Sequence, residues 1–229
     1  MIKSKKQFIL KFFIGLIILM MFYTTGFSLI FLNGSGRGYG EEGGDSVCDE
    51  LKSNSSIITT YIIEGAGYYL DAYSYFNSLL TRIELSDIRG VNYIECNQLI
   101  NSALYNIKYA KVTYYLLIEV AEITPYNQTV ISKLKNFDYD FYMNEHTLNS
   151  VIFKDMENYL KNGDIRGVYR KIYLDVIEIE KLLTSIKDKL SLDKMPDLSI
   201  LWELNEAFGD TLIFGQYGAR VFYTLQKNK

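Results

Sequence analysis

Hydrophobic residues recur at alternating steps of four and three along most of the chain after residue 45, which is the spacing of one face of a helix. One such series runs from Ile58 to Ile83, and another runs from Ile172 to Leu190. No segment shows the sustained alternation of hydrophobic and polar residues that is typical of strands. The pattern therefore predicts an all-α fold.

Capping and breaking residues divide this pattern into five predicted helices. The first helix begins at Asp45. The second is expected over 88–123, with Asp87 as its N-cap and Pro125 after its end. The core positions expected in these two helices are Ile58, Ile62, Gly65, Tyr69, Ala72, Phe76, Leu79, Ile83, Leu99, Ala103, Ala110, Tyr114 and Leu117.

The second half of the chain has its own boundary signals. A third helix is expected over 141–161, and Gly163 is expected to end it. An extra helical turn is expected before it, over 130–134. Asp164 then caps the fourth helix, and Asp197 after a proline opens the fifth. The core positions expected in the last two helices are Ile172, Val176, Ile179, Leu183, Ile186, Leu190, Leu201, Leu204, Phe208, Leu212 and Phe222.

The pentapeptide Asp-Ile-Arg-Gly-Val occurs twice, at 87–91 and 164–168, each time at a predicted turn between helices. Three pairs of hydrophobic residues also align before the two copies: Phe76 with Phe153, Leu79 with Met156 and Ile83 with Leu160. The repeated unit is therefore a helical hairpin. Two such hairpins predict an antiparallel four-helix bundle, with the fifth, C-terminal helix packed on it.

Each residue of the pentapeptide has a structural task in this interpretation. The aspartate caps the helix, the isoleucine and valine pack, and the glycine permits close approach of the partner helix. The alternative is an anion site in which Arg89 and Arg166 act as clamps. The structural interpretation is favoured, because it accounts for four of the five residues.

Residues 1–32 have the features of an export signal. Four lysines occur before residue 12, no acidic residue is present, and residues 12–32 carry no charge. This length suffices for a membrane span, for which about 20 residues are needed, but small residues at Gly26 and Ser28 also fit a cleavage site. An uncleaved anchor and a cleaved signal peptide both remain open. In either case the chain after Leu32 is expected outside the cytoplasm, as a periplasmic, secreted or single-pass membrane-anchored protein.

The glycine-rich stretch 33–44 follows the export segment directly, so it is interpreted as a flexible linker to a domain over 45–229. A phosphate-binding loop would require a preceding strand. Of the 24 basic residues four precede residue 12, whereas all 27 acidic residues follow residue 32, which gives the exported part a formal charge of −7. This charge argues against binding to nucleic acid.

Catalytic and metal-binding motifs are not found in the sequence. His146 is the single histidine, which excludes a bis-histidine haem and the paired Glu-x-x-His motifs of di-iron bundles. No cofactor, metal site or catalytic residue is predicted. Cys48 and Cys96 lie near opposite ends of the first helix, roughly 50 Å apart at 1.5 Å per residue, so no disulfide is expected between them.

Tyrosine is abundant, with 20 residues in the chain. The simplest explanation for this high tyrosine content is a compositional bias of the genome. Alternatively, seven tyrosines of the first two helices are candidates for the lining of a ligand pocket between helices. They are Tyr61, Tyr68, Tyr69, Tyr75, Tyr105, Tyr109 and Tyr114. The sequence favours a non-catalytic binding or interaction module in the cell envelope, with a protein partner or an oligomer. The alternative is a small-ligand sensor or enzyme that uses this tyrosine pocket.

Overall fold

The computed structural model describes residues 45–86, 90–123, 128–141 and 150–227. Every regular element within these residues is a helix, which confirms the predicted all-α fold. Four helices are long: α3 (Asp45–Glu84), α5 (Tyr93–Ile123), α9 (Ile165–Leu190) and α10 (Leu198–Lys227). Two are short: α6 (Gln128–Lys135) and α8 (Ser150–Lys161).

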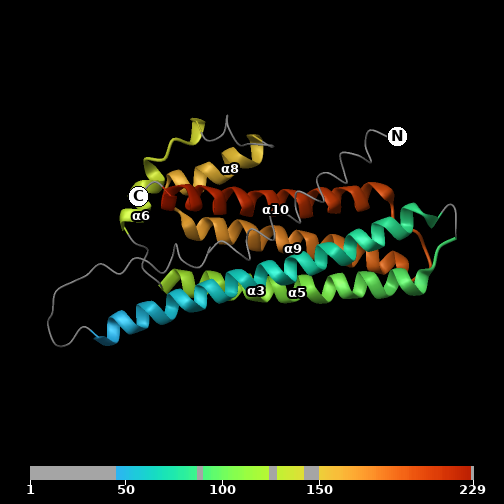
Figure 1. Cartoon of the computed structure of the whole chain (residues 1–229). Helices are drawn as coiled ribbons and strands as arrows, with labels where there is room; N and C mark the ends of the chain where they lie inside the picture. Colours follow the sequence, from blue (N-terminus) through green and yellow to red (C-terminus); the bar gives the residue numbers. More distant parts are fainter. Residues whose placement is uncertain (1–44, 87–89, 124–127, 142–149, 228–229) are drawn as a thin grey trace.

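The four long helices lie side by side and run in alternating directions (Figure 1). Helix α5 packs against α3 on one side and α9 on the other, and α10 contacts α9, α8 and α3. The short helices α6 and α8 contact each other near one end of the assembly, beside the C-terminal end of α10 (Figure 1). The C-terminal helix α10 therefore packs against three helices of the chain, α3, α8 and α9.

Phe208 joins α10 to α3. Its ring stacks with those of Tyr73 and Phe76 at centroid distances of 5.0 Å and 5.5 Å, and it meets the Tyr69 ring edge-on at 5.4 Å. The Tyr69 hydroxyl also donates a hydrogen bond to the Phe208 backbone carbonyl (2.7 Å). This aromatic group fixes α10 on the side of α3 that faces the core.

Most of the predicted core positions are buried. The three pairs aligned before the pentapeptides are all buried: Phe76, Leu79, Ile83, Phe153, Met156 and Leu160. The exceptions are Ile62, Leu99, Ile172 and Leu212, which are half-buried against the core, and Phe222, whose side chain lies outside the described residues. Spacing alone therefore located the inner faces of the helices.

The turn before α9 has the predicted capping geometry. Gly163 adopts a left-handed conformation (φ 72°), and its N–H donates to the Leu160 carbonyl. The Asp164 carboxylate accepts a hydrogen bond from the Gly167 N–H at 2.8 Å, as an N-cap does. Asp197 likewise accepts from the Ser199 N–H at 3.0 Å, at the start of α10.

The predicted start of the second helix is wrong. Helix α5 begins at Tyr93 rather than near Ile88, and its cap is Asn92, whose side-chain oxygen accepts a hydrogen bond from the Glu95 N–H (3.2 Å). Gly90 lies outside the helix in a left-handed conformation (φ 76°). Asp87, the predicted cap, lies outside the described residues.

The third helix, expected over 141–161, is confirmed in its C-terminal part. Helix α8 begins at Ser150 and ends at Lys161, as expected at its C-terminus, whereas residues 142–149 lie outside the described part. The extra turn expected over 130–134 is confirmed as α6, which buries Leu134.

The predicted export segment over 1–32 and the linker over 33–44 also lie outside the described residues. Within the described part, no helix combines the length and the hydrophobicity that a membrane crossing requires.

Candidate interaction surface

The structure divides the seven candidate tyrosines into two groups. Tyr69 and Tyr114 are buried in the core, and burial raises the pKa of both hydroxyls. The Tyr114 ring lies close to Gly65, where an added Cβ would be 3.2 Å from the ring. These two tyrosines pack the seam between α3 and its neighbours α5 and α10.

Of the other five tyrosines, Tyr75, Tyr105 and Tyr109 are exposed, whereas Tyr61 and Tyr68 are half-buried at the edge of the core. Tyr61, Tyr68 and Tyr75 are seven residues apart, so they form one row along α3. The Tyr68 ring contacts the Tyr109 ring of α5 at a centroid distance of 5.2 Å, and Tyr109 contacts Tyr105 at 4.7 Å. A hydrogen bond with Tyr109 raises the pKa of the Tyr105 hydroxyl. The two helices thus join their tyrosines into one cluster.

This cluster continues along α5 as a hydrophobic stripe. Tyr105, Tyr109, Val112 and Leu116 follow steps of four, three and four, and all four side chains are exposed, with 59% of Tyr105 and 53% of Val112 accessible. The opposite side of α5 is buried at steps of three and four from Cys96 to Ala121. Helix α5 is therefore apolar on its outside as well as on its core side.

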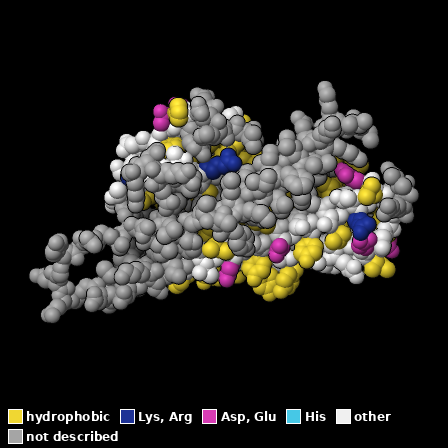
Figure 2. All heavy atoms as spheres, in the orientation of Figure 1, with side chains coloured by type: hydrophobic (Ala, Val, Ile, Leu, Met, Phe, Trp, Pro, Cys, Tyr) yellow, Lys and Arg dark blue, Asp and Glu magenta, His cyan; other side chains and the backbone are white. Residues whose placement is uncertain are grey.

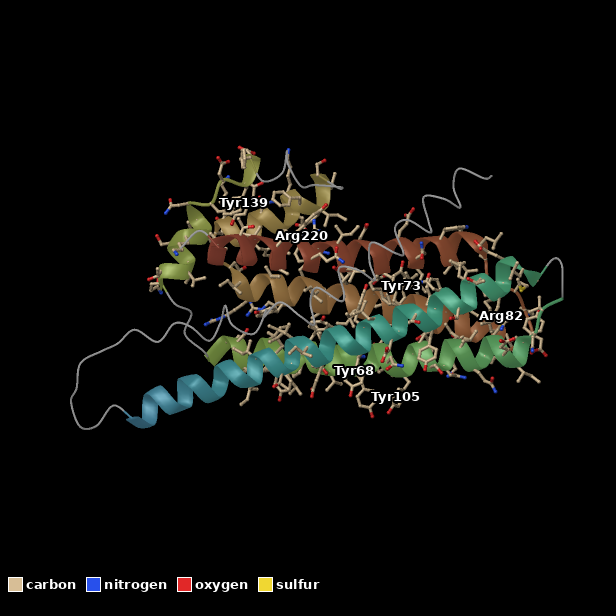
Figure 3. All side chains as sticks on the ribbon, in the orientation of Figure 1. Tyr68, Tyr73, Arg82, Tyr105, Tyr139 and Arg220 are labelled. Carbon is tan, nitrogen blue, oxygen red and sulfur yellow. The ribbon has the colours of Figure 1, made fainter. Side chains whose placement is uncertain are left out.

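We name the tyrosines Tyr61, Tyr68, Tyr75, Tyr105 and Tyr109, together with Val112 and Leu116, the outer face. Figure 2 shows hydrophobic side chains gathered at the edge of the molecule formed by α3 and α5, with acidic side chains beside them. In Figure 3, Tyr68 and Tyr105 lie on the side of α3 and α5 away from α10, whereas Tyr73 lies toward α10. The outer face is thus separate from the aromatic group around Phe208.

Charged side chains border the outer face. Glu64 and Asp71 are exposed on α3, and Lys108 and Glu119 are exposed on α5. The ion pairs Lys111–Glu180 and Arg170–Glu122 lie toward α9, where they link α5 to that helix. Tyr115, near the same edge, has its pKa raised by a hydrogen bond with Glu119.

Only one of the two candidate anion clamps, Arg166, lies among the described residues. Arg166 is half-buried in the first turn of α9, one residue before Gly167, whose N–H is bound by the Asp164 cap. Arg89 lies outside the described residues, as does His146. Among the side chains that the structure describes, no group of three or more histidine, cysteine or acidic residues is placed to hold a metal ion.

Cys96 is a free, buried thiol on α5, and burial raises its pKa. A raised pKa keeps the thiol protonated, which makes it a poor nucleophile. Cys48 lies within α3, but its side chain is outside the described part. Cys96 therefore acts as a packing residue in the seam between α3 and α5.

Sequence reasoning selected the tyrosines of the outer face as the lining of a pocket between helices, and it did not single out Val112 and Leu116. The signal was present in the sequence: two interleaved hydrophobic series on one predicted helix, one from Ala103 through Ala110 to Leu117 and one from Tyr105 through Val112 to Leu116. A second series on a helix marks a second contact surface, because one series suffices to pack against the core.

Scans against protein-family models, curated proteins and solved structures find no match to this chain.

Proposed function

We propose that this protein is a non-catalytic interaction module that binds a partner through the outer face of α3 and α5. The observation that carries the proposal is the exposed stripe from Tyr105 to Leu116 on a helix whose opposite side is already buried. A helix that is hydrophobic around its circumference is normally buried on all sides, and contiguous exposed hydrophobic patches mark interaction sites.

The chemistry of the stripe supports a protein partner. Tyrosine is enriched at protein interfaces because its ring buries a large apolar area while its hydroxyl keeps a hydrogen-bonding partner. Five tyrosines on one face provide several such anchors, and the contact between Tyr105 and Tyr109 restrains two of them before binding.

Cross-linking of the full chain in its native membrane and soluble fractions, followed by mass spectrometry, tests this function. The double variant Tyr105→Ser/Val112→Ser is expected to lose the partner that the wild-type chain retains. Leu174→Ser, at a position exposed to 59% on α9, is the matched control and is expected to retain it. Recovery of the same cross-linked partners with the double variant would contradict the proposal.

We further propose that residues 1–32 direct the chain out of the cytoplasm, as an uncleaved anchor or as a cleaved signal, with 33–44 as a linker to the helical domain. The four lysines before an uncharged stretch support this orientation. A C-terminal reporter enzyme that is active only outside the cytoplasm is expected to be active when fused to the full chain. Activity of a cytoplasm-specific reporter at the same position would contradict this placement.

We also infer that the two repeated hairpins belong to one antiparallel bundle, in which α10 completes a ring with α3, α5 and α9. The contacts of α10 with both α9 and α3 support this arrangement. A short bifunctional thiol cross-linker is expected to join Tyr73→Cys to Asn205→Cys, because the Tyr73 hydroxyl lies 3.4 Å from the Asn205 side-chain oxygen. Failure of this cross-link, with both single variants reactive, would argue against the ring.

A further inference from the structure

The acidic border of the outer face identifies the charge of its partner, provided that the proposed docking function is correct. Glu64 and Asp71 each follow a tyrosine of the α3 row by three residues, so they lie next to that row. Both carboxylates are exposed, and neither forms an ion pair with a described residue. They are available to a partner that covers the tyrosines.

The spacing of this border matches a helix. Glu64 and Asp71 are seven residues apart, which corresponds to about 10 Å along α3, and the neighbouring tyrosines repeat at the same interval. A partner helix laid along α3 and α5 presents its own side chains at the same interval. An extended segment rises about 3.3 Å per residue and does not reproduce the seven-residue register.

The opposite border, on α5, adds little positive charge. Lys108 is basic and Glu119 is acidic, so the exposed border as a whole has three carboxylates and one ammonium group. A second copy of this chain would bring the same carboxylates, and an anionic membrane surface would bring further negative charge. Electrostatic complementarity disfavours both.

We propose that the outer face binds an amphipathic helix of another protein, whose apolar stripe is flanked by lysine or arginine residues seven positions apart. The apolar stripe packs on Tyr68, Tyr109 and Val112, while the basic residues reach Glu64 and Asp71. Arginine in these positions also lies over tyrosine rings, where its positive charge is attracted to the ring face.

Two synthetic helical peptides, each about three heptads long, test the charge requirement against the full chain in detergent micelles. Both carry the same leucine stripe, but one is flanked by arginines and the other by glutamates at the same positions. Fluorescence anisotropy is expected to show binding of the arginine peptide at least ten-fold tighter than that of the glutamate peptide, with an affinity that falls as salt is added. Equal affinities, or no binding of the arginine peptide, overturn the inference.

The charge variant is Glu64→Gln/Asp71→Asn, which keeps the size of both side chains. Each exposed ion pair contributes a factor of roughly 1.5 to 5 in affinity, so the variant is expected to bind the arginine peptide about three- to ten-fold more weakly. Asp188→Asn/Glu206→Gln removes two exposed carboxylates from α9 and α10 and serves as the control, with unchanged binding expected. An equal loss in both variants would show a non-specific effect of net charge and would overturn the inference.

The variant Tyr105→Ser/Val112→Ser separates the two proposals. If it abolishes binding of both peptides but Glu64→Gln/Asp71→Asn has no effect, the outer face is a docking surface and the charge inference fails. If peptide binding is unchanged in Tyr105→Ser/Val112→Ser, the docking function fails as well. Wild-type dimers that form in a concentration-dependent way in sedimentation, and that are lost in this variant, would show that the outer face binds a second copy of the chain. Flotation of the wild type with anionic vesicles, if lost in this variant, would show that it binds a membrane. Either result would overturn the helical partner.

Discussion

The two copies of the pentapeptide Asp-Ile-Arg-Gly-Val have identical sequences but occupy different positions relative to their helices. In the second copy, Ile165 begins α9 and Gly167 lies within its first turn. In the first copy, Gly90 and Val91 precede α5, which begins only at Tyr93. A local sequence therefore does not fix where a helix begins.

The residue before each copy accounts for the difference. Gly163 precedes the second copy and adopts the left-handed conformation that ends α8, so that Asp164 is free to cap the next helix. Ser86 precedes the first copy, beyond the end of α3 at Glu84, and it does not adopt a left-handed conformation. The left-handed position then falls on Gly90, whose N–H donates to the Ser86 carbonyl at 2.8 Å.

This difference shifts the core register of the following helices by one residue. The buried positions of α9 include Val176, Ile179, Leu183, Ile186 and Leu190. Those of α5 include Ile100, Ala103, Ile107, Ala110 and Tyr114, each 76 residues earlier, whereas the pentapeptides are 77 residues apart. The hairpins match before their turns and are displaced after them, because the turn of the first hairpin has a different conformation.

The largest expected effect is that of Gly167→Ala in the second copy. A Cβ atom there would lie 2.6 Å from both Cδ1 of Tyr159 and Cγ of Asp164, so the ring and the capping carboxylate must move. Overpacking of this kind costs about 1–3 kcal/mol, and loss of the cap adds about 1 kcal/mol. Chemical denaturation is expected to show a free energy of unfolding lower by about 3 kcal/mol, and an unchanged value would refute the close packing of this turn.

Gly90→Ala in the first copy is expected to cost less. Nothing lies within 4 Å of the added Cβ, so the cost comes only from the left-handed backbone (φ 76°), about 1–2 kcal/mol. Denaturation of this variant beside Gly167→Ala measures the contrast directly. If Gly90→Ala lowered the free energy of unfolding more than Gly167→Ala, the left-handed backbone at Gly90 would matter more than the close packing at Gly167, and this ranking would be wrong.

The two different caps are expected to contribute equally. Asp164→Ala removes the acceptor for the Gly167 N–H, and Asn92→Ala removes the acceptor for the Glu95 N–H. Each is expected to lower the free energy of unfolding by about 1 kcal/mol. If Asn92→Ala had no effect, the start of α5 at Tyr93 would lose its physical basis. If Asp164→Ala had none, the pentapeptide would need a function other than capping.

The smallest expected effect concerns the aspartate cap before α10, Asp197. The hydrogen bond from the Ser199 N–H lowers the pKa of Asp197 below its ordinary value. Its stabilising contribution is therefore complete above the ordinary carboxyl pKa and is lost as the pH falls through the lowered pKa of the folded state. Thermal unfolding of the wild type and of Asp197→Ala is expected to differ at pH 6 and to converge near pH 2. A difference that persists at pH 2 would contradict this linkage.

Hydrophobic spacing predicted the helices and most of their buried faces from the sequence, because a helix that packs on one core repeats its apolar residues at steps of three and four. Spacing did not predict the order in which the helices pack. Helix α10 contacts α9, α8 and α3. Its contact with α3 depends on the aromatic group around Phe208, whose other members lie 132–139 residues from Phe208 in the sequence.

The candidate site was predicted only in part. Composition selected seven tyrosines, but Tyr69 and Tyr114 differ from Tyr68 and Tyr109 only in the side of the helix on which they lie. The spacing had already placed Tyr69 and Tyr114 on the core face, and they are buried. How far the faces next to the core face are covered depends on where the neighbouring helices pack, which the spacing does not encode.

The sequence by itself determined that this chain is helical, where most of its helices end, and which residues face its core, because these properties follow from the helical repeat and from the chemistry of caps and glycines. Tertiary structure decided that Gly90 of the first pentapeptide lies in a left-handed conformation before its helix, whereas Gly167 of the second lies in the first turn of α9. It also decided that Tyr75, Tyr105 and Tyr109 remain exposed whereas Tyr69 and Tyr114 are buried, because burial depends on which neighbouring helix covers each face.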